Sequence, residues 1–554
     1  MSSSNSNYGT YSPALPSFLF LLADDIGWGD FSYNNGTALT PNIDAWAKRD
    51  GSVLLQDFHS GGTVCSPTRA TILTGRHHFR DCVDFVYGCS DMSQCVPNFE
   101  FAPSKTFTVG DAVRTAFPEE YDGNGVFFAG KWHLGSFFND SEAYGGTTSS
   151  PLTHGFNKMN ATIEVAPTAT LNCQCKAEWK KHCKFGHYHE PNHCFPEGEC
   201  CFNYWWDDPM APHGVTNLTW PTPLDDSLYL ADAFSRFLEE RSSSEKPFLA
   251  QISFHHCHIP FIASEKAKRD CAAGKTCRLP EKGEPPYTDQ ELDYYACLTE
   301  LDNAVGIILR AVQEYGYYNN TMIWFATDNG PEHNCPPLGL CQKADTLPHR
   351  PVEGPGSSGP LRGRKRDIYE GGHRVPGVVS YPSEVRGGNH ITWETVTTMD
   401  FLPTVMEILK VERPENQRTW AMDGRSILPL LRNPANFTWK ETTEGVRSLG
   451  IAYRHHDRKV ADGWGFRFGP WKYVHGSMSC TVAECQRPQL YNLEDDLGER
   501  HDLSAKHPYI LANMTTQFNQ WFHSVSKSRH EESKCRLADL LQLPGSSRTD
   551  REIN

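Results

Sequence analysis

The sequence predicts an α/β fold: a large domain in which helices flank a mixed, mostly parallel sheet, and a small C-terminal α+β subdomain with an antiparallel sheet. Two observations carry this prediction. Short apolar runs alternate with stretches of helical period over most of the chain, and each run ends in a polar loop. From about residue 440 the sequence pattern changes to short strand-like segments followed by one polar helix.

The strand-like runs of the large domain are each followed at once by polar, mostly Gly-rich residues. They are Phe18–Ala23, Val53–Phe58, Val126–Ala129, Phe248–Phe254 and Met322–Thr327. Helix-like stretches such as Leu228–Glu240 and Tyr294–Tyr315 lie between them. Because ligands bind beyond the carboxyl ends of parallel strands, we expect the polar residues after these runs to meet at one site.

We place the large domain at residues 14–435 and the C-terminal subdomain at residues 436–554. In the subdomain, Phe466–Phe468 and Trp471–Val474 are strand-like, and His507–Phe522 has the pattern of a polar helix. This arrangement predicts a smaller unit attached to the end of the large one.

Two segments of the large domain look inserted, since neither has the period of a helix or a strand. Residues 172–203 are rich in Cys and His, and residues 331–360 are rich in Pro and Gly. We expect both to be surface loops tied by disulfides. The first also raises the hypothesis of a zinc site, but its spacings match no standard finger, and disulfides are favoured.

Composition and charge exclude several classes of protein. Of the 554 residues 38% are hydrophobic and 21% charged, which is typical of a packed globular protein. The net charge of −15 argues against nucleic acid as a partner. The longest apolar run, around Phe18 to Ala23, is too short to span a bilayer, so we expect no stable membrane insertion.

The 19 cysteines indicate an oxidising compartment, and a secreted or endolysosomal location is expected. Three pairs lie close enough in sequence to form local disulfides: Cys271 and Cys277, Cys335 and Cys341, and Cys480 and Cys485. Seven N-glycosylation sequons agree with this location, at Asn35, Asn139, Asn160, Asn217, Asn319, Asn436 and Asn513. No charged side chain precedes Asp24, so the basic start of a signal peptide is not visible.

A twelve-residue run begins at Cys65 and ends at Arg76. Pro67 suits the first turn of a helix and Gly75 suits its end, so Cys65 is expected at a helix N-terminus, which favours anions. Arg69 adds a positive charge one turn later. A structural cysteine is the alternative for a lone Cys, but the complete run is far more specific.

This run resembles the signature of the type I, formylglycine-dependent sulfatases, with Thr68 where many members have Ser. Further motifs of the family extend the resemblance over most of the chain: Asp24–Asp30, Gly130–Gly135, His154–Phe156, Thr327–Gly330, Tyr369–Gly372 and Leu490–Leu493. Their order is most similar to arylsulfatase and N-acetylgalactosamine-6-sulfatase-like members. The resemblance implies that the large domain is an alkaline-phosphatase-like catalytic sulfatase domain.

Asp24, Asp25, Asp328 and Asn329 offer hard oxygen ligands from two strand ends. Such a set suits Ca²⁺ or Mg²⁺ and disfavours zinc. The resemblance implies calcium, with an oxygen of the modified Cys65 completing the shell.

Lys131 and His133 lie two apart in a Gly-bounded loop, so both can face one anion. After the run Phe248–Phe254 the family's His-x-Pro pattern selects His258, not its neighbours His255 and His256, as the functional histidine.

Lys365 aligns with the family's sulfate-binding lysine, since it stands four residues before Tyr369 in a Tyr-Glu-Gly-Gly motif. Arg364 and Arg366 replace the small residues common there, which predicts a more basic pocket than usual.

The resemblance also implies the mechanism. A formylglycine-generating enzyme oxidises Cys65 to an aldehyde, whose hydrate attacks the sulfur of a sulfate ester while two lysines and the cation stabilise the charge. His258, possibly with Lys365, protonates the leaving alcohol, His133 takes the proton that releases sulfate, and Arg69 holds the hydrate. A sulfated carbohydrate or an aryl sulfate is the expected substrate.

Two other functions remain open. The same fold and metal serve phosphate or phosphonate ester hydrolysis. A calcium-stabilised protein that only binds sulfated glycans, with Cys65 left as a thiol, is the alternative without catalysis.

Overall fold

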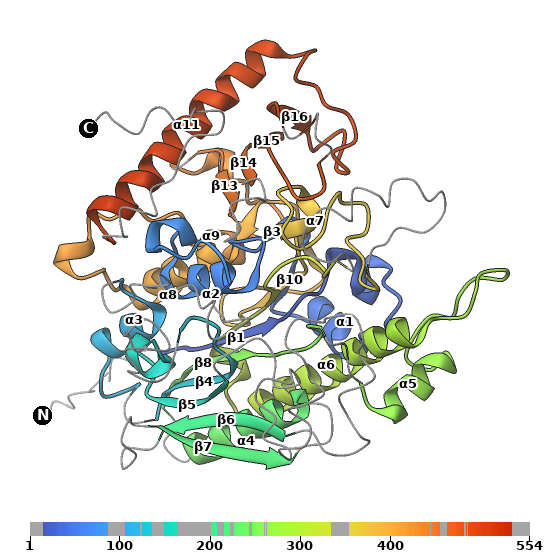
Figure 1. Cartoon of the computed structure of the whole chain (residues 1–554). Coiled ribbons are helices and arrows are strands. Elements are labelled where there is room, and N and C mark those ends of the chain that lie inside the picture. Colours follow the sequence, from blue (N-terminus) through green and yellow to red (C-terminus); the bar gives the residue numbers. More distant parts are fainter. Residues whose placement is uncertain are drawn as a thin grey trace, which may run out of the picture.

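The computed structural model describes most of the chain and places a central sheet between two layers of helices (Figure 1). The described residues are 15–86, 106–121, 124–135, 149–162, 201–207, 215–221, 226–242, 246–259, 261, 263–333, 354–443, 445–454, 463–480, 484 and 486–533.

The central sheet has ten strands. In spatial order they are β11 (His390–Thr392), β2 (Ser52–Leu55), β10 (Gly377–Ser380), β9 (Thr321–Thr327), β1 (Ser17–Ala23), β8 (Leu249–Ser253), β4 (Val126–Lys131), β5 (Lys158–Thr162), β6 (Cys201–Asp207) and β7 (Val215–Pro221). The five strands from β9 to β5 are parallel, whereas β10, β6 and β7 pair antiparallel with their neighbours. The mixed, mostly parallel sheet is confirmed.

Strand β1 shows why both faces of the sheet are covered. Its residues alternate between two hydrophobic cores, with Phe18, Phe20 and Leu22 in one and Leu19 and Leu21 in the other. The first core is closed by α2 (Cys65–Thr74), α3 (Val109–Ala116), α8 (Phe401–Leu409) and α9 (Leu428–Arg432). The second is closed by α1 (Pro41–Lys48), α4 (Ser227–Ser242) and α6 (Asp289–Glu314), and α5 (Glu265–Ala272) packs on α6.

The C-terminal part forms a second, antiparallel sheet, as predicted (Figure 1). Its strands are β13 (Ser448–Tyr453), β14 (Gly463–Phe468), β15 (Trp471–His475) and β16 (Gln489–Asn492). Helix α11 (Pro508–Glu531) covers one face through Phe518 and Phe522. Ile368 and Tyr369 of the large domain pack among residues of the small sheet in a separate core. The boundary at residues 435 and 436 stays a prediction.

The structure differs from the expected elements in two places. The run Val53–Phe58 is not one strand, because polar Gln56 and Asp57 turn the chain between β2 and the short β3 (Phe58–His59), which pairs with β12 (Val396–Thr397). The end of the segment 172–203 is strand β6 and not loop. The rest of that segment, the zinc hypothesis and residues 334–353 lie outside the described part.

Two disulfides have both of their cysteines among the described residues. The predicted bond between Cys271 and Cys277 is confirmed, and a second joins Cys257 to Cys297. Cys65 is a free, buried thiol. Cys335, Cys341 and Cys485 lie outside the described residues, so those two predicted pairings stay predictions.

Four of the sequons have exposed asparagines: Asn35, Asn319, Asn436 and Asn513. Asn160 is buried in β5 and donates to the Tyr229 hydroxyl at 2.8 Å, which leaves no room for a glycan in the folded protein. None of the described helices has the length and apolar character needed to cross a membrane.

Candidate active site

The candidate site lies at the carboxyl ends of the parallel strands. Asp24 and Asp25 follow β1, Asp328 and Asn329 follow β9, and these strands are neighbours in register from Ser17 to Ala23. Lys131 is the last residue of β4, and the turn with His258 follows β8. The convergence expected from the polar residues after each apolar run is what the structure has.

Helix α2 brings Cys65 to this edge, because Cys65 is its first residue and no side chain caps its N-terminus. The helix ends at Gly75, whose φ of +65° suits glycine, as predicted. Two hydroxyls of the first turn fix neighbouring loops. Ser66 Oγ donates to the His133 carbonyl at 2.6 Å, and Thr68 Oγ1 donates to the Asp328 carbonyl at 2.6 Å.

The four predicted metal ligands form a buried oxygen cluster. Asn329 Nδ2 donates to Asp25 Oδ1 at 2.7 Å, and the Asp25 amide donates to Asp328 Oδ1 at 3.3 Å. Asn329 Oδ1 is buried and accepts no hydrogen bond from the described residues. Buried acceptors are normally satisfied, and a hard cation would satisfy this one, so the donor set fits Ca²⁺.

Cys65 and His258 border the same cluster. Cys65 Sγ lies 3.6 Å from Asp24 Oδ1, and His258 Nε2 lies 3.6 Å from Asp25 Oδ2. Ligand atoms of these four residues all lie within 4.8 Å of one another. The sequence placed His258 beside the substrate, whereas the structure also brings it close to the metal ligands.

Arg69 forms hydrogen bonds with two carboxylates of the cluster and with the end of β4. Its guanidinium donates to Asp328 Oδ2 at 2.8 Å, to Asp24 Oδ2 at 3.1 Å and to the Lys131 carbonyl at 2.7 Å. The side chain is buried, so these ion pairs are shielded from solvent. Arg69 therefore holds two carboxylates and a strand end in place.

The two candidate sulfate-binding lysines pair with different carboxylates. Lys131 Nζ contacts Asp24 Oδ2. Lys365 Nζ lies 2.7 Å from Asp25 Oδ2 and 2.9 Å from Glu332 Oε2. Both ammonium groups thus stand at the edge of the oxygen cluster, where an anion would meet them.

The pKa values of the carboxyl groups reflect this crowding. Burial and the nearby Asp328 raise the pKa of Asp24 to about 7, and burial also raises the pKa of Asp25. Burial opposes ionisation of Asp328 too, but Arg69 and Lys131 outweigh it and lower its pKa. Three buried carboxyl groups in contact favour a bound cation.

The pKa values of Cys65 and His258 shift in opposite directions. Burial, then Asp24 and Asp328, raises the pKa of the Cys65 thiol well above its ordinary value, which outweighs the opposite effect of a helix N-terminus. Burial, then Lys365 and Lys131, holds the pKa of His258 well below its usual range. His258 Nδ1 donates to the Ile259 carbonyl at 2.7 Å, which leaves Nε2 for the site.

Three residues of the site other than glycine have a left-handed backbone: Asp25 (φ +57°), His133 (φ +56°) and Arg366 (φ +76°). Such conformations cost on the order of 1–3 kcal/mol each and gather at functional sites. Here they lie in three loops around one cluster, which supports a functional role for that cluster.

The three neighbouring histidines separate in the structure. His255 Nδ1 lies 2.6 Å from Asp226 Oδ2, and His256 Nδ1 contacts Ser227 Oγ, both at the start of α4. Only His258 of the three points to Asp25.

Sequence reasoning missed Glu332, whose carboxylate pairs with Lys365 and with both terminal nitrogens of Arg366. Its position three residues after Asn329 was the available signal. The guanidinium of Arg364 donates to the carbonyls of Gly354, Gly356 and Glu332, and the more basic pocket stays a prediction.

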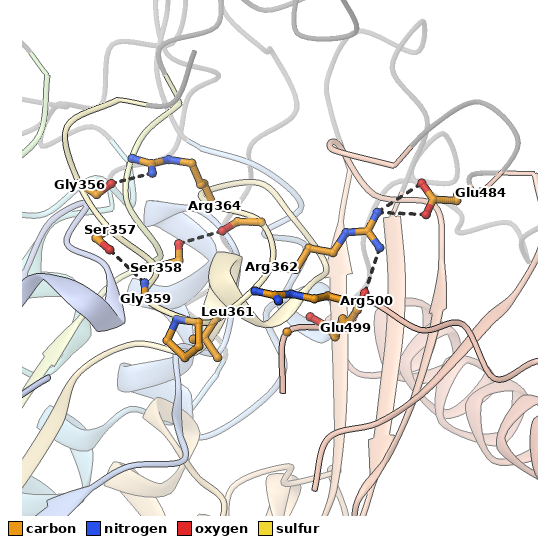
Figure 2. Close-up of a pocket in the computed structure, with 13 residues that line it drawn as sticks. Gly356, Ser357, Ser358, Gly359, Leu361, Arg362, Arg364, Glu484, Glu499 and Arg500 are labelled. Carbon is orange, nitrogen blue, oxygen red and sulfur yellow. Dashed lines mark hydrogen bonds and ion pairs between the residues drawn. The ribbon is translucent and has the colours of Figure 1, made fainter. Parts of the chain in front are cut away.

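A separate cavity of about 550 Å³ lies between residues 356–364 and residues 484 and 498–500 (Figure 2). Arg362 spans it by donating to Glu484 Oε1 at 3.2 Å and to the Glu499 carbonyl at 3.1 Å. No candidate catalytic residue lines this cavity. It lies beside the loop that leads to Lys365.

Comparison with known proteins agrees with this geometry. Residues 16–411 match the family model described as sulfatase, and residues 363–526 match one described as N-sulphoglucosamine sulphohydrolase, C-terminal. The chain therefore belongs to the sulfatase family, whose members are sulfuric ester hydrolases.

Individual similarities extend over nearly the whole chain. N-acetylgalactosamine-6-sulfatase of Canis lupus familiaris is 27% identical over 556 residues, which cover 96% of this chain and 90% of that protein. The PsFucS1 sulfatase from Pseudoalteromonas sp. has a TM-score of 0.63 and 20% identity, with 93% and 91% covered. A phosphonate monoester hydrolase of Agrobacterium radiobacter has a TM-score of 0.53 and 18% identity, with 92% and 96% covered.

Proposed function

We propose that this sulfatase uses a formylglycine made from Cys65 to hydrolyse sulfate esters of carbohydrates. One observation carries the proposal: Cys65 begins α2 with its sulfur 3.6 Å from Asp24, at the point where the oxygen cluster and the two lysines meet. A hydrated aldehyde at this position supplies the attacking hydroxyl and a second hydroxyl through which sulfate is released.

We infer that Asp24, Asp25, Asp328 and Asn329 hold a Ca²⁺ ion, with an oxygen of the modified Cys65 as a further ligand. The buried acceptor of Asn329 and the raised pKa of Asp24 support this assignment. When bound, the cation neutralises sulfuryl oxygen and activates the hydroxyl that attacks. Arg69 favours the ionised form of Asp328 and orients the carboxylates of Asp24 and Asp328.

The other side chains have roles that follow from where they stand. Lys131 and Lys365 bind the sulfuryl oxygens, since an entering anion can replace part of their contact with Asp24 and Asp25. The negative charge of a bound sulfate favours the protonated form of His258, which we assign as the donor of the proton that the leaving alcohol needs. His133 takes up the proton when sulfate is released.

The substrate class is inferred from a similar protein, and the cellular setting from the disulfides. The name of the N-acetylgalactosamine-6-sulfatase favours a sulfated sugar. A secreted or endolysosomal location is supported by the buried disulfides Cys257–Cys297 and Cys271–Cys277, and it would bring the chain to a formylglycine-generating enzyme during maturation.

Phosphonate ester hydrolysis is the second candidate, because the hydrolase of Agrobacterium radiobacter shares the fold. The two functions are distinguished by measuring kcat/KM for 4-nitrophenyl sulfate and for 4-nitrophenyl phenylphosphonate under the same conditions. We expect the sulfate to be the better substrate, and faster cleavage of the phosphonate would favour the alternative.

The proposal is tested by mass spectrometry of the tryptic peptide that ends at Arg69, from protein made in a eukaryotic secretory host. We expect a peptide lighter by the difference between a thiol and an aldehyde, and no such peptide from a Cys65→Ala variant. An intact thiol in the wild type, while a control sulfatase from the same host is converted, would contradict the proposal and favour a protein that only binds sulfated glycans.

A further inference from the structure

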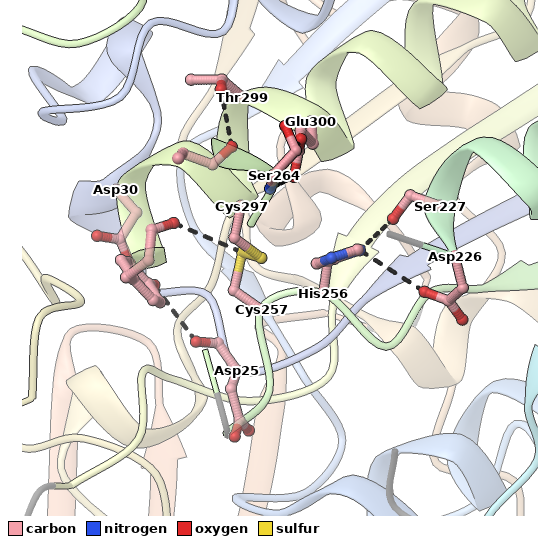
Figure 3. The surroundings of a disulfide bond; sticks show 12 residues. Asp25, Asp30, Asp226, Ser227, His256, Cys257, Ser264, Cys297, Thr299 and Glu300 are labelled. Atoms are coloured by element: carbon pink, nitrogen blue, oxygen red, sulfur yellow. Dashed lines mark hydrogen bonds and ion pairs between the residues drawn. A yellow bond between two sulfur atoms is a disulfide. The ribbon is translucent and has the colours of Figure 1, made fainter. Parts of the chain in front are cut away.

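The disulfide between Cys257 and Cys297 joins the turn after β8 to helix α6 near Asp25 of the candidate site (Figure 3). Cys257 lies between His256 and His258, and Cys297 lies inside α6. Both side chains are buried, with exposed fractions of 0% and 1%. The disulfide therefore lies in the protein interior and not on the surface.

The turn that contains Cys257 is also bound to the metal-ligand loop through its main chain. The Asp24 amide donates to the His256 carbonyl at 2.9 Å, and the Cys257 amide donates to the Asp24 carbonyl at 2.8 Å. The His258 amide closes the turn by donating to the His255 carbonyl at 2.9 Å. His258 follows Cys257 at once, so a shift of Cys257 is passed to His258.

Helix α6 gives this turn and the Asp25 loop a common support. The Tyr294 hydroxyl donates to Asp30 Oδ2 at 2.7 Å and contacts the Asp25 carbonyl at 3.4 Å. The Tyr294 ring packs edge to face on Phe261, which follows the turn in the sequence, with ring centroids 5.1 Å apart. Among the described contacts of the turn with α6, the disulfide is the covalent one.

We propose that Cys257 and Cys297 are positioning residues for the reaction: their disulfide fixes His258 relative to Asp25 so that Nε2 reaches the leaving-group oxygen. The inference rests on the proposed function of His258. Proton transfer requires the two heavy atoms to lie within about 3.2 Å, and a displacement of about 1 Å can cost about 100-fold in rate. Without the disulfide, the described links between this segment and α6 are non-covalent, such as the packing of Phe261 on Tyr294.

The test is the dependence of kcat/KM on the leaving group. Phenol is a worse leaving group than 4-nitrophenol and needs a proton more, so loss of a positioned acid slows phenyl sulfate more than 4-nitrophenyl sulfate. For a C257A/C297A variant we expect the ratio of the two kcat/KM values to change at least about tenfold. A C271A/C277A variant, which lacks the disulfide between α5 and Cys277, should keep the wild-type ratio.

A double-mutant cycle with His258→Gln shows whether the disulfide acts through His258. Removal of the disulfide in the H258Q background should leave the leaving-group ratio unchanged, because the group that it positions is gone. An equal loss for both esters in C257A/C297A, or a further change in the H258Q background, would overturn the inference.

Thermal unfolding of each variant shows whether it is folded. If C257A/C297A does not fold, a C257V/C297A variant that refills the volume of the sulfurs takes its place, with the same expected ratio. If the wild type cleaves neither ester, the proposed function fails and this inference with it, whereas an unchanged ratio in an active variant overturns only the inference.

Discussion

Asn329 is the residue whose environment bears most directly on the metal. Its buried Oδ1 accepts no hydrogen bond from the described residues, so binding of Ca²⁺ should stabilise the folded protein. A ligand at 100 times its Kd adds about 2.7 kcal/mol. We expect calcium to raise the melting temperature of the wild type after chelation with EGTA, and Asn329→Ala to need at least about tenfold more calcium for the same rise.

Asn320→Ala is the matched control, because Asn320 stands just before β9 and Asn329 just after it. Asn320 donates to the Leu15 carbonyl, away from the oxygen cluster. Its calcium titration should follow the wild type. Identical titrations of all three proteins would show that Asn329 does not bind the metal.

For single residues, the sequence predicts which side chains could bind a metal better than it predicts which partners a charged side chain contacts. Asp24 and Asn329 could be predicted to meet because each follows an apolar run and parallel strands end at one edge. Glu332 is close to Asn329 in the sequence, but its pairing with Lys365 and Arg366 could not be predicted, since these two residues lie beyond a long insertion. Arg364 was assigned to the pocket by its charge, but charge does not reveal that main-chain carbonyls surround the guanidinium.

Strand β4 depends on Gly130 at the position before Lys131. Its φ is +92°, and a Cβ there would meet the Ser253 carbonyl oxygen of β8 at 1.9 Å. Gly130→Ala must therefore separate β4 from β8 or move Lys131. We expect a loss of about 3 kcal/mol or more in the free energy of unfolding and a large fall in kcat/KM, measured by denaturant unfolding and with 4-nitrophenyl sulfate.

Gly283→Ala is the control for Gly130→Ala, because it measures the destabilisation caused by a positive φ without a steric clash of the added Cβ. Gly283 has a φ of +105° but no atom within 4 Å of an added Cβ. We expect it to cost about 1–2 kcal/mol and to leave kcat/KM unchanged. Equal losses in the two variants would mean that the contact with β8 is not what requires glycine.

Elements with a strong local pattern could be predicted from the sequence alone. Cys65–Thr74 has a proline in its first turn and a glycine after its last residue, and it is the helix expected. Val53–Phe58 was expected to be one strand because it is apolar at both ends. Asp57 divides it, since its carboxylate pairs with Arg374 and Arg467 from distant parts of the chain.

Across the whole molecule, ion pairs between buried arginines and partly exposed carboxylates join α11 to the large domain. Arg529 of α11 pairs with Asp84, and Arg76 after α2 pairs with Glu532. These residues are more than 400 positions apart, and surface and buried arginines look alike in a sequence, so this interface could not be predicted. It gives the C-terminal subdomain a fixed position beside the helix that carries Cys65.

Two buried histidines make this interface sensitive to acid. His77 and His78 stack with ring centroids 4.4 Å apart, and the His77 ring meets Trp521 of α11 edge to face at 5.0 Å. Burial lowers the pKa of His78 to about 4 and holds the pKa of His77 well below its usual value. His78 Nδ1 donates to the Val83 carbonyl, and the main chain of Ala452 also favours the protonated ring, but burial outweighs both.

The sign of the pH effect follows from these pKa values. Between pH 6.5 and about 4 the unfolded state binds a proton at His78 that the folded state refuses, so its contribution to stability falls as the pH falls. The loss is about 1.4 kcal/mol per pH unit below 6.5, or about 2 kcal/mol at pH 5. Glu499 acts in the opposite direction, because its raised pKa of about 7 favours the folded state as the pH falls.

A His78→Asn variant isolates this contribution, because asparagine keeps a donor for the Val83 carbonyl but does not titrate. Between pH 7 and pH 5 its free energy of unfolding should fall by about 2 kcal/mol less than that of the wild type, as measured by urea unfolding at each pH. His523→Asn, at an exposed position of α11, should keep the wild-type difference. Parallel pH curves for H78N and wild type would contradict this prediction, because they would mean that His78 binds its proton equally well in the folded and unfolded states.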